Sequence, residues 1–162
     1  MRTAFARIVS LALVLLAAPL LAESSLRERL QGTWRLVSYE SSTTDGQKWF
    51  KRFGDDAKGY IHYDATGHMI VAFEKMPPPA KFASGDDWKP TAEEALAAYE
   101  GFIAYFGTYT VDEAAHAVTH HVEGSLNPSY FGTAQLRPAT LEGDRLTLSD
   151  GKTFRVVWER IR

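Results

Sequence analysis

The chain lacks several features that would narrow its function. It contains no cysteine, so neither disulfides nor thiolate metal sites can stabilise it. The formal net charge is −2 and no lysine and arginine stripe is present, which disfavours nucleic acid as a partner. No Gly-x-Ser-x-Gly, phosphate-binding glycine loop or His-Glu-x-x-His sequence occurs. The fold must therefore depend on burial and hydrogen bonding, and no reaction class follows from a motif.

The N-terminal segment has the pattern of a secretory signal peptide. Arg2 and Arg7 form a basic start, residues 8–18 are apolar apart from one serine, and Ala22 precedes a polar stretch. The apolar part is shorter than the ~20 residues that span a bilayer, which favours cleavage over an uncleaved anchor. We expect a signal peptide at residues 1–22, one domain at residues 23–162, and a periplasmic or secreted protein without a stable membrane span.

Alternating apolar and polar residues, separated by turn residues, indicate an all-β chain. The expected strands are residues 33–41, 59–64, 68–73, 107–111, 117–123, 130–137, 140–148 and 153–161. Gly67 occupies the turn of one predicted hairpin, where a positive φ is needed. About eight strands are enough to close an antiparallel barrel that holds one small ligand.

One segment departs from this alternation. Thr91 is followed by two glutamates and then by apolar residues at helical spacing, which predicts a helix near residues 91–106. A helix cannot belong to the barrel wall, so we expect it to close one end as a plug or lid near the cavity mouth. Trp34, at the start of the first strand, is expected to fill the barrel floor.

Short sequence blocks throughout the chain carry a resemblance to a known family. They are Gly32–Leu36, Gly59–Ile61, Gly67–Met69, Ala104–Tyr109, His120–Pro128, Gly132–Arg137 and Gly143–Leu148. In this order the blocks resemble the bacterial lipocalin-like domain family. The resemblance implies a small antiparallel barrel with a central cavity. It implies little about activity, although related barrels bind hydrophobic molecules and some lipocalin-like proteins catalyse cyclisation or isomerisation.

Polar groups on the expected inner face are the candidate ligand contacts. Adjacent strand residues point to opposite faces, and His120 shares a phase with Val118 and Val122, so His120 rather than His121 should face inward. A buried imidazole bonded to a neighbouring strand is the alternative to ligand contact or proton transfer. His116 would lie at a turn, so neither a metal site nor a cofactor is expected.

Gln135 and Arg137 share the other candidate face. Arg137 in the cavity could hold a carboxylate or another anion. Alternation alone favours the reverse, with Ala134 and Leu136 in the core and Arg137 in solvent. The candidate ligand-binding residues are His120, Tyr109, Gln135, Arg137, Met69 and Phe73.

Three functions remain open. The first is an exported lipocalin-like protein that binds a small apolar or amphipathic molecule in its cavity. The second is an isomerase or cyclase with His120 as general acid or base, although no paired catalytic group is visible. The third is a solidly packed envelope module without a ligand. The sequence indicates neither the oligomeric state nor the ligand.

Overall fold

The computed structural model describes residues 24–43 and 47–162, and the expected signal peptide lies outside the described residues. The elements are α1 (Leu26–Leu30), β1 (Gly32–Ser42), β2 (Trp49–Phe50), β3 (Lys58–Tyr63), β4 (His68–Glu74), α2 (Ala92–Gly101), β5 (Phe102–Asp112), β6 (Ala117–Ser125), the 3₁₀ turn η1 (Pro128–Tyr130), β7 (Ala134–Glu142), β8 (Arg145–Ser149) and β9 (Phe154–Arg160). None of the helices in this part of the chain is long and apolar enough to cross a membrane.

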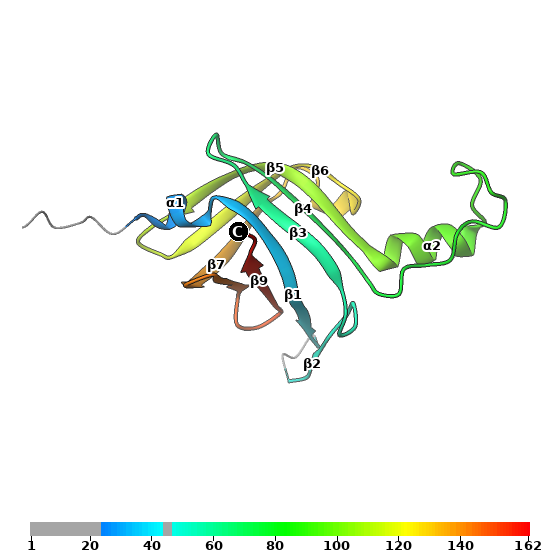
Figure 1. Cartoon of the computed structure of the whole chain (residues 1–162), viewed down its shortest axis with the longest axis horizontal. Coiled ribbons are helices and arrows are strands. Elements are labelled where there is room, and N and C mark those ends of the chain that lie inside the picture. The colour runs from blue at the N-terminus through cyan, green and yellow to red at the C-terminus, as the bar shows by residue number, and fades with distance from the viewer. Residues whose placement is uncertain (1–23, 44–46) are drawn as a thin grey trace, which may run out of the picture.

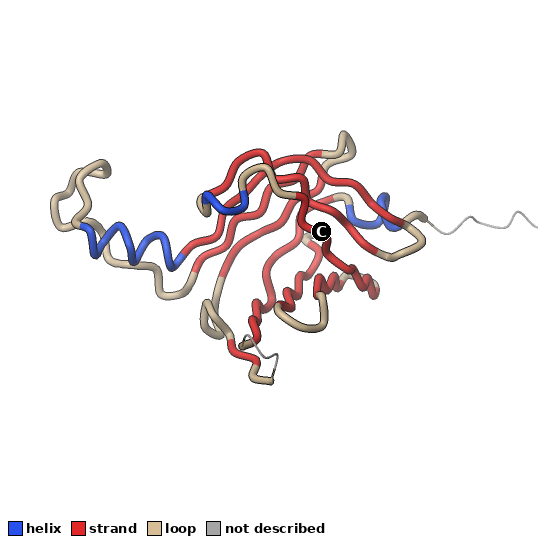
Figure 2. The backbone as a smooth tube through the Cα atoms, turned by 180° about the vertical axis from the view of Figure 1, so that it is seen from behind, coloured by secondary structure: helices blue, strands red, loops and turns tan. Residues whose placement is uncertain are grey.

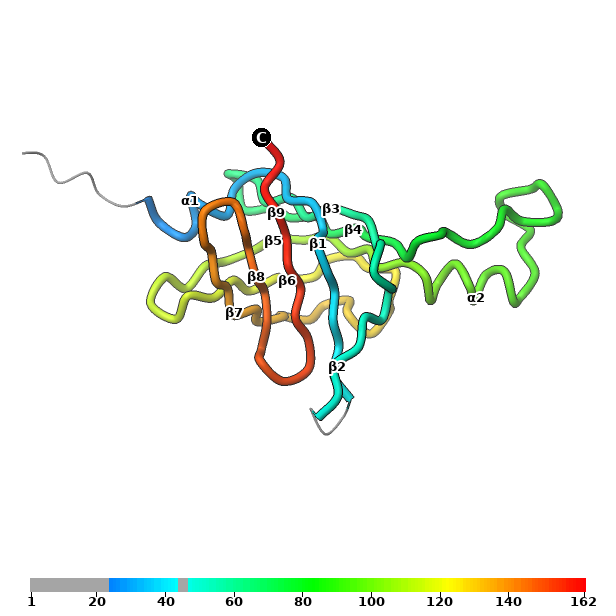
Figure 3. The backbone as a smooth tube through the Cα atoms, turned by 60° about the horizontal axis from the view of Figure 1, so that its bottom comes forward, coloured from blue at the N-terminus to red at the C-terminus, as the bar shows by residue number. Residues whose placement is uncertain are grey.

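The strands form one closed antiparallel barrel, as the alternation predicts. Each strand from β3 to β9 pairs with the next, β1 pairs with β3, and β1 also pairs with β9, which closes the sheet. The two-residue strand β2 pairs with Ser41 and Ser42 at the C-terminal end of β1, beyond the residues of β1 that pair with β3. β1 and β9 lie side by side in the ring (Figure 3). The turn at Gly67 has φ of 99°, as the predicted hairpin requires.

Inward residues follow the period-two pattern. Met69, Val71 and Phe73 of β4 are buried, and so are Leu146 and Leu148 of β8. On β9, Val156 and Trp158 are buried and Phe154 packs against the same core. These side chains converge on one hydrophobic core inside the barrel, as expected for a strand with one face toward the interior.

Several element boundaries differ from the sequence expectation. The expected strand at residues 140–148 is interrupted by a turn at Gly143, so residues 140–142 end β7 and β8 covers Arg145–Ser149. The predicted helix at residues 91–106 is present but ends at Gly101, and Phe102 begins β5. Ile103 and Tyr105 continue the inward alternation of β5, and pairing with β4 outweighs the helical spacing. The expected strand at residues 130–137 begins only at Ala134, because a 3₁₀ turn precedes it.

The position of α2 also differs from the expected plug. α2 and the loop before it extend away from the barrel, at the end opposite α1 (Figures 1 and 2). Leu96 and Tyr99 of α2 remain exposed, so its apolar face is not buried against the barrel. The opposite end of the barrel is covered by α1, whose Leu26 and Leu30 are buried.

Hydrogen bonds to the turn after β5 hold α1 in place. The carboxylate of Glu113 accepts hydrogen bonds from the backbone N–H of Leu26 at 2.7 Å and of Arg27 at 3.0 Å. Ser25 and Glu28 add a reciprocal capping box. One end of the barrel is therefore closed by a short capped helix that is bonded to the turn after β5.

Candidate functional site

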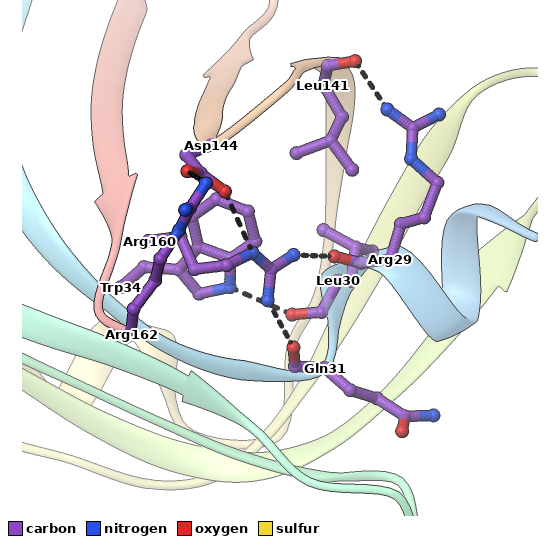
Figure 4. Close-up of polar contacts among 8 residues, drawn as sticks. All are labelled: Arg29, Leu30, Gln31, Trp34, Leu141, Asp144, Arg160 and Arg162. Atoms are coloured by element: carbon purple, nitrogen blue, oxygen red, sulfur yellow. Dashed lines mark hydrogen bonds and ion pairs between the residues drawn. The ribbon is translucent and has the colours of Figure 1, made fainter. Parts of the chain in front are cut away.

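The closed end of the barrel is built around Trp34, which is fully buried (Figure 4). Its indole N–H donates to the carbonyl oxygen of Leu30 at 2.8 Å, and the Arg160 guanidinium lies 4.0 Å from its ring centroid. Arg160 also donates to the carbonyls of Gln31, at 2.7 Å, and of Arg29. Trp34 thus fills the floor, as the sequence predicts.

Above the floor, three side chains from different strands form a buried polar chain. Nε2 of His120 on β6 lies 2.7 Å from the hydroxyl oxygen of Tyr63 on β3. Nδ1 of the same imidazole lies 3.0 Å from the hydroxyl oxygen of Tyr105 on β5. His120 is wholly buried, so its inward orientation is as the strand phase predicts. Both ring nitrogens are occupied by tyrosines, so a proton from the cavity would reach His120 only through Tyr105.

Burial determines the protonation states of Tyr63, His120 and Tyr105. It lowers the pKa of His120 to about 3, with smaller contributions from the positive charge of Arg137 and from His121. Burial also raises the pKa of Tyr105 to about 12, although Arg137 opposes the rise, and raises the pKa of Tyr63 well above its usual value. At neutral pH the His120 imidazole is therefore neutral, and so are the two phenols that it contacts.

A cavity of about 340 Å³ lies inside the barrel, toward the end opposite α1. Tyr105 lines this cavity, whereas Tyr63, on the other side of His120, does not. This volume lies within the range of small-molecule sites. The lining is largely apolar and aromatic, with a few polar groups. It consists of Tyr39, Ile61, Val71, Phe73, Ile103, Tyr105, Tyr130, Gln135, Arg137, Leu148, Thr153, Phe154, Val156 and Trp158.

Arg137 is the cationic group of this lining. Its guanidinium lies 4.5 Å from the ring centroid of Phe154 and donates to Oε1 of Gln135. Nε2 of Gln135 in turn donates to the hydroxyl of Thr133 at 3.2 Å. Arg137 also lies close enough to Tyr105 to oppose the rise that burial causes in the pKa of that phenol. The guanidinium is therefore held in place by neutral neighbours on one wall of the cavity.

The structure places Gln135 and Arg137 inside, which corrects the orientation that alternation favoured. Leu136 is 60% exposed and Ala134 is also exposed, so the apolar residues of this stretch face solvent. The register between β6 and β7 explains the reversal. Gln135 lies opposite His120, and directly opposed residues share a face of the sheet. Because His120 points inward, Gln135 and Arg137 must also point inward.

The other candidate residues separate into two groups. Phe73 lines the cavity. Met69 is buried in the core and Tyr109 lies in the closed half, and neither is among the lining residues. The Tyr109 hydroxyl donates to the carbonyl oxygen of Asp64 at 2.7 Å, and its ring packs on Tyr63 with centroids 4.9 Å apart.

Sequence reasoning missed Tyr39 and Tyr130 as lining residues. Tyr39 lies near the far end of β1, and its ring contacts Phe53 and Phe73 at centroid distances of 5.3 Å. Tyr130 ends the 3₁₀ turn and packs edge-on against Tyr105. The inward phase of Trp158 was visible in the sequence. Its indole N–H has no hydrogen-bond partner among the described residues.

A second pocket of about 350 Å³ borders the cavity at the open end. The two share Tyr39, Ile103 and Tyr130, and the second is also lined by Tyr99 and Glu100 from the last turn of α2. The end of α2 therefore lies at the rim without covering the cavity. In the part of the chain that the structure describes, no three histidine or acidic side chains cluster as metal ligands do.

Comparisons with known proteins add a family and one relative. The lipocalin-like domain family matches residues 31–161. The 4'-hydroxy-3'-methoxypropiophenone carrier protein of Aspergillus oryzae is 37% identical over 75 residues, which cover 43% of this chain and 63% of that relative. This chain thus matches less than two thirds of the relative's length. A solved variant of the fluorescent protein UnaG aligns over 82% of this chain and 96% of its own, at 13% identity and a TM-score of 0.36.

Proposed function

Because this chain belongs to the lipocalin-like domain family, we propose that it binds a small, largely apolar molecule inside its barrel. The observation that carries the proposal is the cavity of about 340 Å³ between the polar chain of His120 and the open end. Its apolar walls would supply affinity, and its few polar groups would orient the ligand. A solidly packed module would leave no such space in its core.

The similar Aspergillus protein is named as a carrier, and carriage of a small molecule is the role that we propose here. The match with that protein is partial, so its named cargo is not assigned to this chain. Arg137 and Gln135 would contact the ligand directly, together with Phe73. His120 would act behind Tyr105, as a support for that hydroxyl rather than as a contact.

Binding can be tested with N-phenyl-1-naphthylamine, a neutral probe whose fluorescence rises in apolar surroundings. We expect saturable binding to the purified protein and loss of binding in Val156→Phe, because Val156 lines the cavity and a larger ring fills it. Val37→Phe, at an exposed position, is the matched control and should bind the probe normally. Circular dichroism would establish that both variants fold.

The natural ligand can be sought by native mass spectrometry of protein purified from its own source. A retained small molecule that is displaced by the probe would support the proposal. The proposal is wrong if no molecule is retained and the probe binds the wild-type protein and Val156→Phe equally.

We also propose that the protein acts outside the cytoplasm, on the basis of the N-terminal sequence pattern alone. Sequencing of the mature N-terminus should give a start close to Glu23. A mature protein that retains residues 1–22 would contradict export by cleavage.

A further inference from the structure

We propose that the ligand is an apolar carboxylate whose anionic group contacts the Arg137 guanidinium and receives a hydrogen bond from the Tyr105 hydroxyl. This inference rests on the proposed function, because it names the chemical class that the same cavity selects. It depends on three features of the cavity: an unpaired cation, a fixed direction of hydrogen bonding, and the absence of acids from the wall.

The first feature is the charge of Arg137. Among the described residues it contacts the Gln135 amide and the Phe154 ring, and both are neutral. Tyr105, which lines the same cavity, is also neutral. No ion pair involves Arg137 in that part of the chain, whereas Arg35, Arg155, Arg160 and Arg162 each pair with a carboxylate. A partly buried guanidinium without a counter-charge is stabilised by an anion that enters beside it.

The second feature is the direction of the buried hydrogen bonds. Tyr63 is fully buried, and its hydroxyl has His120 Nε2 as its partner, with no other among the described residues. If Nε2 carried the proton, the Tyr63 hydroxyl hydrogen would have no acceptor in the core, and an unsatisfied buried donor is costly. The Tyr63 hydroxyl therefore donates to Nε2.

This direction determines what Tyr105 offers to the cavity. A neutral imidazole that accepts at Nε2 carries its proton at Nδ1, so Nδ1–H donates to the hydroxyl oxygen of Tyr105. The Tyr105 O–H hydrogen is then not used by His120, and the structure gives it no other acceptor in the described chain. Because Tyr105 lines the cavity, this hydrogen is available to a ligand oxygen.

The third feature is the composition of the wall. The lining contains no aspartate or glutamate, so no carboxylate there repels an anion or pairs with a cation. Trp158 adds a further N–H without a partner in the described chain. Arg137 and Tyr105 therefore both offer hydrogen-bond donors to the cavity, and a carboxylate has two oxygens that can accept from them together.

Titration calorimetry with matched acids and amides tests the inference. The panel is biphenyl-4-carboxylate, naphthalene-2-carboxylate and decanoate, each compared at pH 7.5 with its neutral primary amide. We expect at least one acid to bind at least ~10-fold more tightly than its amide, as expected for a charge-assisted contact. In Arg137→Gln the acid and its amide should bind with similar affinity, because the cation is lost.

Arg145→Gln removes an exposed arginine outside the cavity and should keep the preference for the acid. Three results overturn the inference. They are equal binding of acids and amides to the wild-type protein, a preference that survives Arg137→Gln, and a preference that Arg145→Gln removes equally. If amides and the neutral naphthylamine still bind in these cases, the proposed function stands and only the carboxylate is wrong. If nothing binds, both are wrong.

The hydrogen-bond direction has an independent readout. Nitrogen-15 NMR of the imidazole distinguishes the Nδ1–H from the Nε2–H tautomer without any ligand. We expect His120 to be the Nδ1–H tautomer at pH 7. In an Nε2–H tautomer both hydrogen bonds would run in the opposite direction, and the Tyr105 hydroxyl would donate to Nδ1 of His120. That result would overturn the role of Tyr105 as a donor to the ligand.

Discussion

The hydroxyl oxygen of Tyr63 lies 2.7 Å from Nε2 of His120, and neither side chain is exposed to solvent. The two residues are 57 positions apart in the chain and lie on β3 and β6, which are separated in the sheet by β4 and β5. Their contact therefore crosses the barrel interior. It links the packing of the closed half to the polar wall of the cavity.

Tyr63→Phe should lower the free energy of unfolding by about 1–3 kcal/mol, because Nε2 of His120 would lose its hydrogen-bond partner in a fully buried site. Urea denaturation followed by circular dichroism measures this change. Tyr60→Phe is the control, since Tyr60 is 54% exposed on the same strand, and it should change stability by less than about 0.5 kcal/mol. Equal effects of the two substitutions would show that the buried hydrogen bond contributes nothing specific.

The lowered pKa of His120 predicts a loss of stability in mild acid. The folded-state pKa is about 3, whereas an unfolded histidine titrates near ~6.5. Between these values the unfolded chain binds one more proton than the folded chain, so stability rises with pH and falls as pH falls. From pH 6.5 to 5 the free energy of unfolding should decrease by about 2 kcal/mol on account of this residue.

His120→Gln should reduce this slope, because glutamine does not titrate. Urea denaturation of both proteins at pH 7, 6 and 5 measures the difference. Carboxyl groups with a lowered pKa, such as Asp150 with a pKa of about 2, change the free energy of unfolding at lower pH. The change between pH 7 and pH 5 is therefore attributed to histidine. The same slope in both proteins would mean that the buried imidazole accepts its proton without unfolding.

The barrel could be predicted because its strands have one buried face. Leu146 and Leu148 flank the polar Thr147 on β8, and both leucines lie inside as that alternation requires. The orientation of Arg137 could not be predicted in this way, because β7 has apolar residues on its outer face. Its orientation follows from the pairing of Gln135 with His120, and register between strands is not visible in one strand's pattern.

The same reasoning explains the error about α2. Its apolar face is real in the sequence, but the pattern does not specify which surface that face meets. In the structure Leu96 is 55% exposed, and the helix leads away from the barrel it was expected to close (Figure 1). The contact between Tyr63 and His120 could also not be predicted from the sequence, because it depends on the registers of four successive strands.

The contact of Glu113 with α1 predicts a local effect at the closed end. Glu113→Ala removes the acceptor of two backbone N–H groups in the first turn of α1, and it should destabilise the protein by about 1–3 kcal/mol. Hydrogen exchange of the Leu26 amide should accelerate with it. Glu123→Ala, at an exposed position of β6, is the control and should change neither quantity. Unchanged exchange at Leu26 in Glu113→Ala would contradict the anchoring of α1 by this carboxylate.

Gly107 on β5 lies where the backbone of β6 leaves no room for a Cβ atom. A Cβ added there would overlap the carbonyl oxygen of His121 and lie 2.9 Å from the backbone nitrogen of Glu123, both on β6, at the point where the register of the two strands shifts. Gly107→Ala should therefore cost at least ~2 kcal/mol, because the obstacle is backbone that belongs to the closed ring. Gly101→Ala is the matched control, since its Cβ would meet only Pro79 at 3.6 Å. Thermal and urea unfolding of the two variants would reveal the difference. If Gly107→Ala were as stable as Gly101→Ala, β5 and β6 could separate at little cost in free energy. The pairing of these two strands, which carry Tyr105 and His120, would then not be rigid.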